Sequence, residues 1–189
     1  MLTIWKTMVQ SKLDYCSVLW SPNDQASISR LESVARHFTA QVAGMEGLDY
    51  WDRLANLHLY SQERRRERYC IIFVWKIAQQ LVQGYNMDFV HNPRRGRLAL
   101  VHQASPQTST PAVKKARDAS LQVKGSKLFN LIPKELRDMS GTVLQFKGRL
   151  DKSLSSVPDQ PTVNGRQRVA QTNSLLDQVP MHHIQSDCI

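Results

Sequence analysis

The sequence is poor in cysteine and has no long apolar run. Its three cysteines, Cys16, Cys70 and Cys188, lie far apart and form no CxxC pair, so neither a disulfide framework nor a zinc ribbon is expected. No apolar run approaches the roughly 20 residues that a membrane-spanning helix needs. Residues 1–6 also lack the basic and apolar regions of a signal peptide. These absences predict a reduced protein of the cytoplasm or nucleus, without a membrane partner.

Residue patterns that are typical of catalytic and metal sites are scarce as well. No two acidic residues are adjacent, and two-metal polymerase chemistry needs close carboxylates. Asp49 and Asp52 share one helical turn, and we interpret them as a helix cap and a solvated residue. His182, His183 and Cys188 lie on a polar tail without a fourth ligand at usable spacing, so they predict no zinc site. We therefore expect no catalytic residue, no metal and no cofactor.

What the sequence does have is a localised excess of positive charge. The 189 residues include 25 Lys and Arg and 16 Asp and Glu, a formal net charge of +9. Residues 61–97 carry a net charge of +5 and residues 111–152 one of +6, whereas the segments 1–60 and 153–189 each carry −1. Clustered cations attract phosphates and gain from the release of counterions, so this distribution predicts a polyanion as partner. The alternative is a solvated basic face.

Three cationic clusters are the candidate contacts to nucleic acid. They are Arg64, Arg65 and Arg68; Arg94, Arg95 and Arg97; and Lys114, Lys115 and Arg117. The first three fall within about one helical turn and would form a stripe that contacts phosphates. Its alternative is a surface salt-bridged to Glu63 and Glu67. Phosphate contacts carry little sequence information, so binding to RNA or DNA should be salt-sensitive and largely non-specific.

Hydrophobic periodicity predicts a mainly α fold. The expected helices cover 2–20, a segment that begins at Ser21-Pro22 and ends at Gly44, 49–57, 61–82, and 142–154, the last with a capping box from Thr142 and Gln145. The second helix should bury Ile28, Leu31, Val34, Phe38 and Val42. In the helix 61–82 the apolar run 71–75 should be core, together with Trp5, while its arginine-rich first turns should face water or phosphate.

Composition divides the chain into three parts. Residues 1–83 should form a helical bundle, and residues 84–154 a small basic α+β-like extension with short strands at 98–101 and 120–123. The segment 128–133 forms a compact apolar knot that ends at a proline. Residues 155–189 are rich in Ser, Pro, Gln and Asn, which predicts a disordered tail.

Several sequence blocks, in this order, resemble the end of the polymerase of LINE-type, jockey-like non-LTR retrotransposons. The blocks are Ser11-Lys12-Leu13-Asp14-Tyr15-Cys16-Ser17-Val18-Leu19-Trp20-Ser21-Pro22, the helix 28–39, Tyr50-Trp51-Asp52-Arg53-Leu54, Leu59-Tyr60-Ser61-Gln62-Glu63-Arg64-Arg65, Arg94-Arg95-Gly96-Arg97, Leu128-Phe129-Asn130-Leu131-Ile132-Pro133, and Phe146-Lys147-Gly148-Arg149-Leu150-Asp151. The resemblance covers about 11–154 and extends to the segment 173–177.

This resemblance implies a thumb and post-thumb region of a reverse transcriptase, which helps to hold template RNA and target DNA. The catalytic aspartates and the endonuclease of that family lie upstream, so the chain would be a non-catalytic fragment that binds nucleic acid. The face of the helix 2–20 that packs on upstream domains in the family would be exposed, which predicts self-association. Two alternatives remain open: a helical protein-interaction module and a translated transposon remnant without function.

Overall fold

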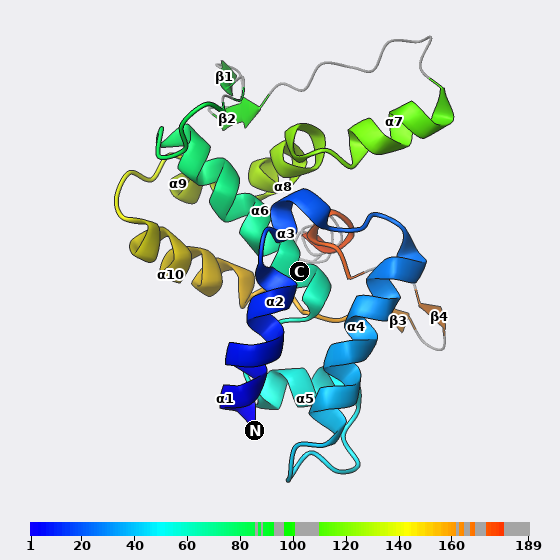
Figure 1. Cartoon of the computed structure of the whole chain (residues 1–189). Helices are drawn as coiled ribbons and strands as arrows, with labels where there is room; N and C mark the ends of the chain where they lie inside the picture. The colour runs from blue at the N-terminus through cyan, green and yellow to red at the C-terminus, as the bar shows by residue number, and fades with distance from the viewer. Residues whose placement is uncertain are drawn as a thin grey trace. The chain divides into compact units, whose positions relative to one another are not determined.

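The computed structural model describes residues 1–85, 87, 89–92, 97–100, 110–161, 163–164, 167–168 and 173–179, and of its strands only the backbone. These residues form a mainly α-helical protein, as the sequence predicts (Figure 1). The chain divides into unit 1, Met1–Arg66 with Asp159–Gln178, and unit 2, Glu67–Pro158 with Val179–Ile189. This division differs from the predicted boundaries at 83 and 154, because a segment from the predicted tail returns to the N-terminal unit.

Unit 1 begins with a helical segment that is interrupted before residue 20. Its parts are α1 (Leu2–Ile4), the π-helical η1 (Trp5–Gln10), α2 (Ser11–Asp14) and α3 (Ser17–Trp20). Cys16 adopts a left-handed backbone conformation with φ of 50°, which ends the helix that the sequence predicts to be continuous over 2–20. The indole Nε1 of Trp20 donates to the carbonyl oxygen of Tyr15 at 2.6 Å, so one carbonyl group at this break is satisfied.

Two capped helices follow, α4 (Gln25–Ala40) and α5 (Tyr50–Asn56). The cap of α4 is Asp24, whose carboxylate accepts from the backbone N–H of Ser27 at 2.8 Å, and not Ser21 as the sequence predicts. Ser21 instead donates its hydroxyl to the carbonyl oxygen of Ser17 at 2.6 Å, which removes it from the capping position. The predicted cap of α5 is confirmed, since Asp49 accepts from the N–H of Asp52 at 2.8 Å.

The core of unit 1 is small and aromatic. Trp5, Ala35, Tyr50 and Leu54 are buried, and Trp5 stacks on Phe38 with 4.4 Å between the ring centroids. The predicted core position of Trp5 is therefore confirmed. The predicted buried face of the second helix is confirmed at Ile28 and wrong at Val34, which is exposed, while Leu31, Phe38 and Val42 are half-buried. Helix α4 also buries Glu32, Ala35 and Thr39, which were not predicted to be buried. The face that contains Glu32 is buried because the Glu32 carboxylate accepts hydrogen bonds from Tyr50, Gln62 and Glu63, which lie on other elements.

Helix α6 (Gln62–Ala78) begins in unit 1 and continues through unit 2. Its first N–H groups are capped as predicted, since the Ser61 hydroxyl accepts from the N–H of Arg64 at 3.1 Å. Its first turns do not face water, because the side chains of Arg64 and Glu67 are fully buried; that prediction is wrong. The predicted burial of the apolar run 71–75 is confirmed except at Phe73, which is half-buried.

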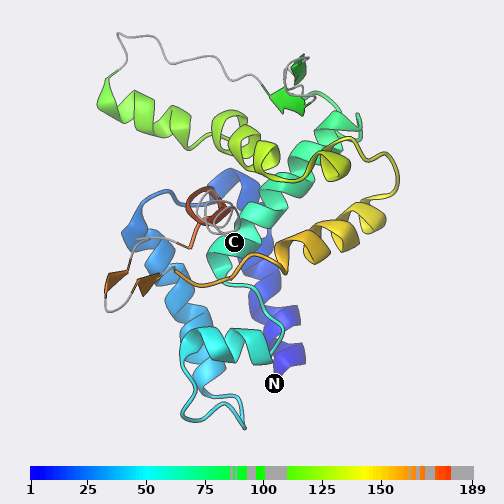
Figure 2. The ribbon, with the colours of Figure 1, turned by 180° about the vertical axis from the view of Figure 1, so that it is seen from behind.

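Unit 2 contains the C-terminal half of α6, four further helices and a π-helical turn. They are α7 (Pro111–Asp118), η2 (Leu121–Gly125), α8 (Ser126–Leu131), α9 (Lys134–Arg137) and α10 (Val143–Leu154). Figure 2 shows the ribbon of these elements from behind. Trp75 of α6 stacks on Phe146 of α10, and its indole N–H donates to the carbonyl oxygen of Met139 at 3.0 Å. The predicted capping box of α10 is present. The strand predicted at 120–123 is wrong, since the segment is helical and buries Val123.

Two short antiparallel hairpins complete the described residues: β1 (Phe89–Asn92) with β2 (Arg97–Leu100), and β3 (Val163–Asn164) with β4 (Gln167–Arg168). The strand predicted at 98–101 overlaps β2. The predicted disorder of the tail is wrong for 173–179, where a helical turn over 175–179 buries Leu175. Of the helices that the structure describes, none combines the length and the apolar composition that a membrane crossing requires.

Candidate functional site

The first predicted cationic cluster is engaged within the protein. Arg65 forms a two-oxygen ion pair with Asp14, with distances of 2.9 and 2.7 Å from Nε and Nη2 to the carboxylate. Arg68 pairs in the same way with Asp151 at 2.5 and 2.7 Å. Arg64 is 0% exposed, and its Nε lies 3.8 Å from Asp159. The structure thus places carboxylates of Asp14, Asp151 and Asp159 beside the arginines that were predicted to contact phosphates.

The other two clusters differ in what the structure describes of them. Arg94 and Arg95 lie outside the described residues, and Arg97 is placed only by its backbone in β2. Lys114 and Lys115 are exposed on α7, and Arg117 on the same helix is half-buried. Two of the nine predicted contacts are therefore fully accessible in the described part of the chain.

Helix α7 presents its lysines through simple local rules. Thr110 caps the helix with a side-chain oxygen 3.5 Å from the N–H of Val113, and Pro111 occupies the first turn, where its missing N–H costs nothing. The helix buries none of its residues. Its cations also lie toward the C-terminal end, where the helix dipole favours positive charge. These features leave α7 as an exposed, cationic helix.

Most of the net charge of the protein lies in one segment of unit 2. Its segment 67–158 contains 15 Lys and Arg and 6 Asp and Glu, a net charge of +9, which equals the formal charge of the full chain. Within the described residues, six cationic side chains of this unit are exposed and make no hydrogen bond or ion pair: Lys114, Lys115, Lys127, Lys134, Arg149 and Lys152. A surface with this charge attracts polyanions.

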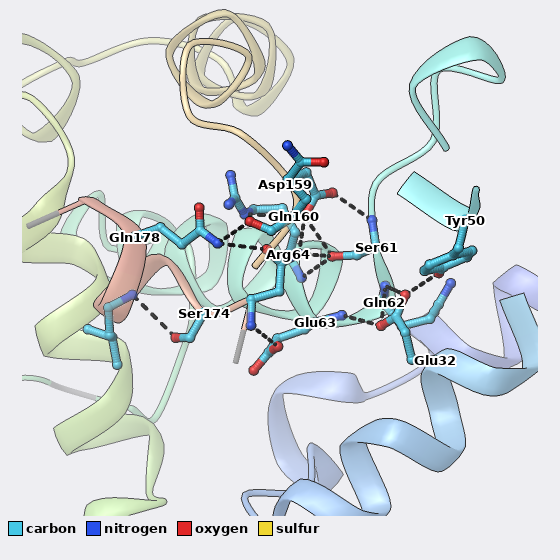
Figure 3. A network of polar contacts seen from close by, with 12 residues as sticks. Glu32, Tyr50, Ser61, Gln62, Glu63, Arg64, Asp159, Gln160, Ser174 and Gln178 are labelled. Atoms are coloured by element: carbon cyan, nitrogen blue, oxygen red, sulfur yellow. Dashed lines mark hydrogen bonds and ion pairs between the residues drawn. The ribbon is translucent and has the colours of Figure 1, made fainter. Parts of the chain in front are cut away.

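Unit 1 contains a different polar site, a buried network around the N-terminus of α6 (Figure 3). Glu32 accepts a short hydrogen bond from the Tyr50 hydroxyl. Its carboxylate also accepts from the backbone N–H of Gln62 at 3.0 Å and of Glu63 at 3.3 Å. A single carboxylate thus satisfies two helix N–H groups and one phenol, at the helix end where the dipole favours an anion.

Burial dominates the electrostatics of this network. Desolvation raises the pKa of Glu32 above its ordinary value of 4.5, although the hydrogen bonds from Tyr50 and Gln62 and the charge of Arg66 act in the opposite direction. Burial, and then the adjacent Glu32 carboxylate, raise the pKa of Tyr50 far above its ordinary range. The phenol therefore keeps its proton and remains the donor in this pair.

The raised pKa of Glu32 predicts that acid favours the folded form of unit 1. Because the folded state binds this proton more tightly than the unfolded state, the free energy of unfolding should fall as the pH rises from about 4.5 through the folded-state pKa of Glu32. Urea unfolding of the wild type and of Glu32→Gln over this range should show the decline only in the wild type. A variant that keeps the same slope would assign the effect to other groups.

A second carboxylate, Asp159, binds the same helix end from the C-terminal segment. Asp159 accepts from the backbone N–H and the hydroxyl of Ser61, each at 2.7 Å. Asn173 donates its N–H to Glu63 at 3.0 Å and its side-chain amide to the Ser61 hydroxyl at 2.9 Å. No sequence pattern predicts a functional role for Glu32 or Asp159. Of the two, only the burial of Glu32 could have been predicted from the sequence, because Glu32 follows the apolar Ile28 by four residues and so lies on the same face of the helix.

No side-chain cluster in the described part of the chain resembles a metal site. Among these residues, no three His, Cys, Asp or Glu side chains lie together as metal ligands do. His182, His183 and Cys188 lie outside the described residues. No protein-family model, no curated protein and no solved structure matches this chain. Its function must therefore be argued from its own surfaces.

Proposed function

We propose that this chain is a non-catalytic module that binds RNA or DNA non-specifically through the exposed cations of unit 2. The observation that carries the proposal is the net charge of +9 on residues 67–158, with exposed lysines that no described carboxylate neutralises. Such side chains gain free energy by displacing the counterions of a phosphate backbone. The resemblance to the thumb and post-thumb region of retrotransposon polymerases supports the same proposal, with no catalytic residue, no cofactor, and the cytoplasm or nucleus as its location.

Within this proposal, Lys114 and Lys115 are the leading contacts. Both are exposed on α7, whereas Arg65 and Arg68 would have to exchange Asp14 and Asp151 for phosphates, which costs the ion pairs that they already make. Lysine contacts fix position on a backbone without reading bases. The protein should therefore bind duplexes of unrelated sequence with similar affinity.

Replacing Lys114 and Lys115 by alanine is expected to weaken binding to a labelled duplex about tenfold at about 0.1 M salt. It should also reduce the slope of log K against log salt concentration by about 1.8, because each phosphate contact contributes about 0.9 to that slope. Fluorescence anisotropy across a salt series with RNA and DNA duplexes measures both quantities.

The matched control is the pair Lys6→Ala and Lys12→Ala, which removes two exposed lysines from unit 1 and leaves the affinity within about twofold. Equal losses in both double variants would mean that binding follows total charge, and that α7 is no interface. Binding that does not change with salt would overturn the proposal.

One observation favours a second candidate, a helical module that binds protein. Ile4, Met8 and Leu19 are more than half exposed on the first helices of unit 1, and Leu19 reaches 81%. Exposed apolar side chains of this size are typical of protein contacts, including self-association. An apolar contact is not weakened by salt, so the salt series distinguishes this candidate from the first.

A further inference from the structure

Two pairs of a hydroxyl residue and a proline lie among the residues that the structure describes, Ser21-Pro22 and Thr110-Pro111. A serine or threonine that is followed by proline is the acceptor of proline-directed protein kinases. Such a kinase also needs an accessible hydroxyl group, on backbone that is extended and can enter the active site of the enzyme. The structure distinguishes the two pairs by this requirement.

The Ser21 hydroxyl is not available for this reaction in the folded protein. Ser21 is half-buried at the end of α3, and its hydroxyl donates to the carbonyl oxygen of Ser17 at 2.6 Å. A phosphate on this oxygen would replace the hydrogen bond with negative charge beside a carbonyl oxygen, which repels it. Ser21 is therefore a poor acceptor.

Thr110 meets the requirement. Its side chain is exposed, and its backbone is extended, with φ of −62° and ψ of 154°, because a following proline disfavours the helical region. Within the described residues its hydroxyl oxygen makes one contact, with the N–H of Val113 at 3.5 Å, which is longer than a typical hydrogen bond. Helix α7 buries none of its residues. An enzyme can therefore reach the hydroxyl of Thr110 without unfolding the helix.

Two of the candidate nucleic-acid contacts follow Thr110 on the same helix. The backbone N–H of Lys114 donates to the carbonyl oxygen of Thr110 at 3.0 Å, and residues four apart lie on the same face of a helix. Lys115 is the next residue, and both lysines are exposed. A phosphate on Thr110 would lie close to these cations, and negative charge is also favourable at the start of a helix.

We propose that Thr110 is the acceptor of a proline-directed kinase, and that its phosphate lowers the affinity of α7 for nucleic acid. The Oγ1 of Thr110 attacks the γ-phosphorus of ATP, the bond from that phosphorus to the β–γ bridging oxygen breaks, ADP leaves, and the hydroxyl proton passes to a base of the kinase. The phosphate adds a charge of about −1.5 to −2 at pH 7, which offsets Lys114 and Lys115. The effect on affinity rests on the proposed function, whereas the modification does not.

The first experiment treats the folded full chain with a proline-directed kinase and ATP. Every protein carries Ser105→Ala, because Ser105-Pro106 lies outside the described residues. Tandem mass spectrometry should locate the phosphate at Thr110 at least about tenfold faster than at Ser21, whose hydroxyl reacts only after local opening. Thr110→Val should remove this phosphate.

A synthetic Ser-Pro peptide in the same tube shows that the kinase is active. If the peptide is phosphorylated and Thr110 is not, the assignment of this site is overturned. Equal rates at Ser21 and Thr110 would also overturn it, because accessibility would then not select the acceptor.

Binding to a labelled DNA duplex measures the second consequence. The phosphorylated protein should bind about tenfold more weakly than the untreated protein at about 0.1 M salt, because the phosphate offsets two cationic contacts. In the double variant Lys114→Ala and Lys115→Ala the same treatment should weaken binding by less than about threefold, since those contacts are already missing. Kinase treatment of Thr110→Val should leave its affinity unchanged.

Unchanged affinity of the phosphorylated protein would overturn the effect on binding. An equal loss in the lysine double variant would overturn it as well, because the phosphate would then act through the total charge and not through α7. If the untreated protein binds no duplex, the proposed function fails, and mass spectrometry still decides whether Thr110 is a phosphorylation site.

Discussion

Replacement of Glu32 by alanine is expected to lower the free energy of unfolding of unit 1 by about 3–5 kcal/mol. The Glu32 carboxylate is buried and accepts from the Tyr50 hydroxyl and from the backbone N–H groups of Gln62 and Glu63. Alanine leaves three donors without this acceptor, and an unsatisfied buried donor costs about 1–3 kcal/mol. The loss should be smaller in Glu32→Gln, which keeps the shape and one acceptor oxygen.

Urea unfolding followed by tryptophan fluorescence measures this effect in a Trp75→Phe background. The remaining tryptophans, Trp5, Trp20 and Trp51, then all report on unit 1. Glu46→Ala is the matched control, because Glu46 is exposed in the loop between α4 and α5, and its loss should change stability by less than about 0.5 kcal/mol. A loss below about 1 kcal/mol in Glu32→Ala would show that water reaches the three donors, and that the network contributes little to folding.

Replacement of Trp75 by alanine is expected to destabilise unit 2 by about 3–5 kcal/mol. The indole of Trp75 is fully buried, stacks on Phe146 with 4.5 Å between the ring centroids, and donates to the carbonyl oxygen of Met139. Alanine removes the stacked ring, opens a large cavity and leaves a buried carbonyl group without this donor. Trp75→Phe retains an aromatic ring and should cost distinctly less.

Hydrogen exchange within α10 measures the stability of unit 2 without interference from unit 1. Protection of the α10 amides should fall by a factor of at least about 150 in Trp75→Ala, which corresponds to about 3 kcal/mol. Trp20→Ala is the control, because Trp20 is 41% exposed and belongs to unit 1, and it should leave α10 protection unchanged. Unaltered protection in Trp75→Ala would mean that unit 2 can repack around the cavity.

Features that depend on neighbours in the sequence were predicted well. The mainly α fold, the caps from Asp49 and Ser61, and the capping box of Thr142 and Gln145 are confirmed. Each cap joins atoms only three residues apart, so its geometry follows from the side chain and the local backbone. The burial of Trp5 and Trp75 follows similarly from apolar spacing along a helix.

Features that depend on distant partners were predicted poorly. The first turns of α6 contain cations and lie after a capping serine, which favours a solvated helix end. Their carboxylate partners, Asp14, Asp151 and Asp159, lie 51 to 95 residues away, and no local pattern connects them to these arginines. The predicted buried face of α4 was wrong at Val34 and omitted Glu32, whose burial only the N–H groups of α6 and the Tyr50 hydroxyl make favourable.

The sequence by itself determined the mainly α class, the approximate positions of α4, α5, α6 and α10, and the stretch of the chain that carries its positive charge, because these depend on local spacing and on composition. Only the tertiary structure decided which cations are accessible. Long-range ion pairs neutralise Arg65 and Arg68, and the buried Arg64 lies 3.8 Å from Asp159, whereas Lys114 and Lys115 on α7 meet no described carboxylate. The physical reason is that an arginine binds whichever anion folding brings to it, and that anion can come from any part of the chain.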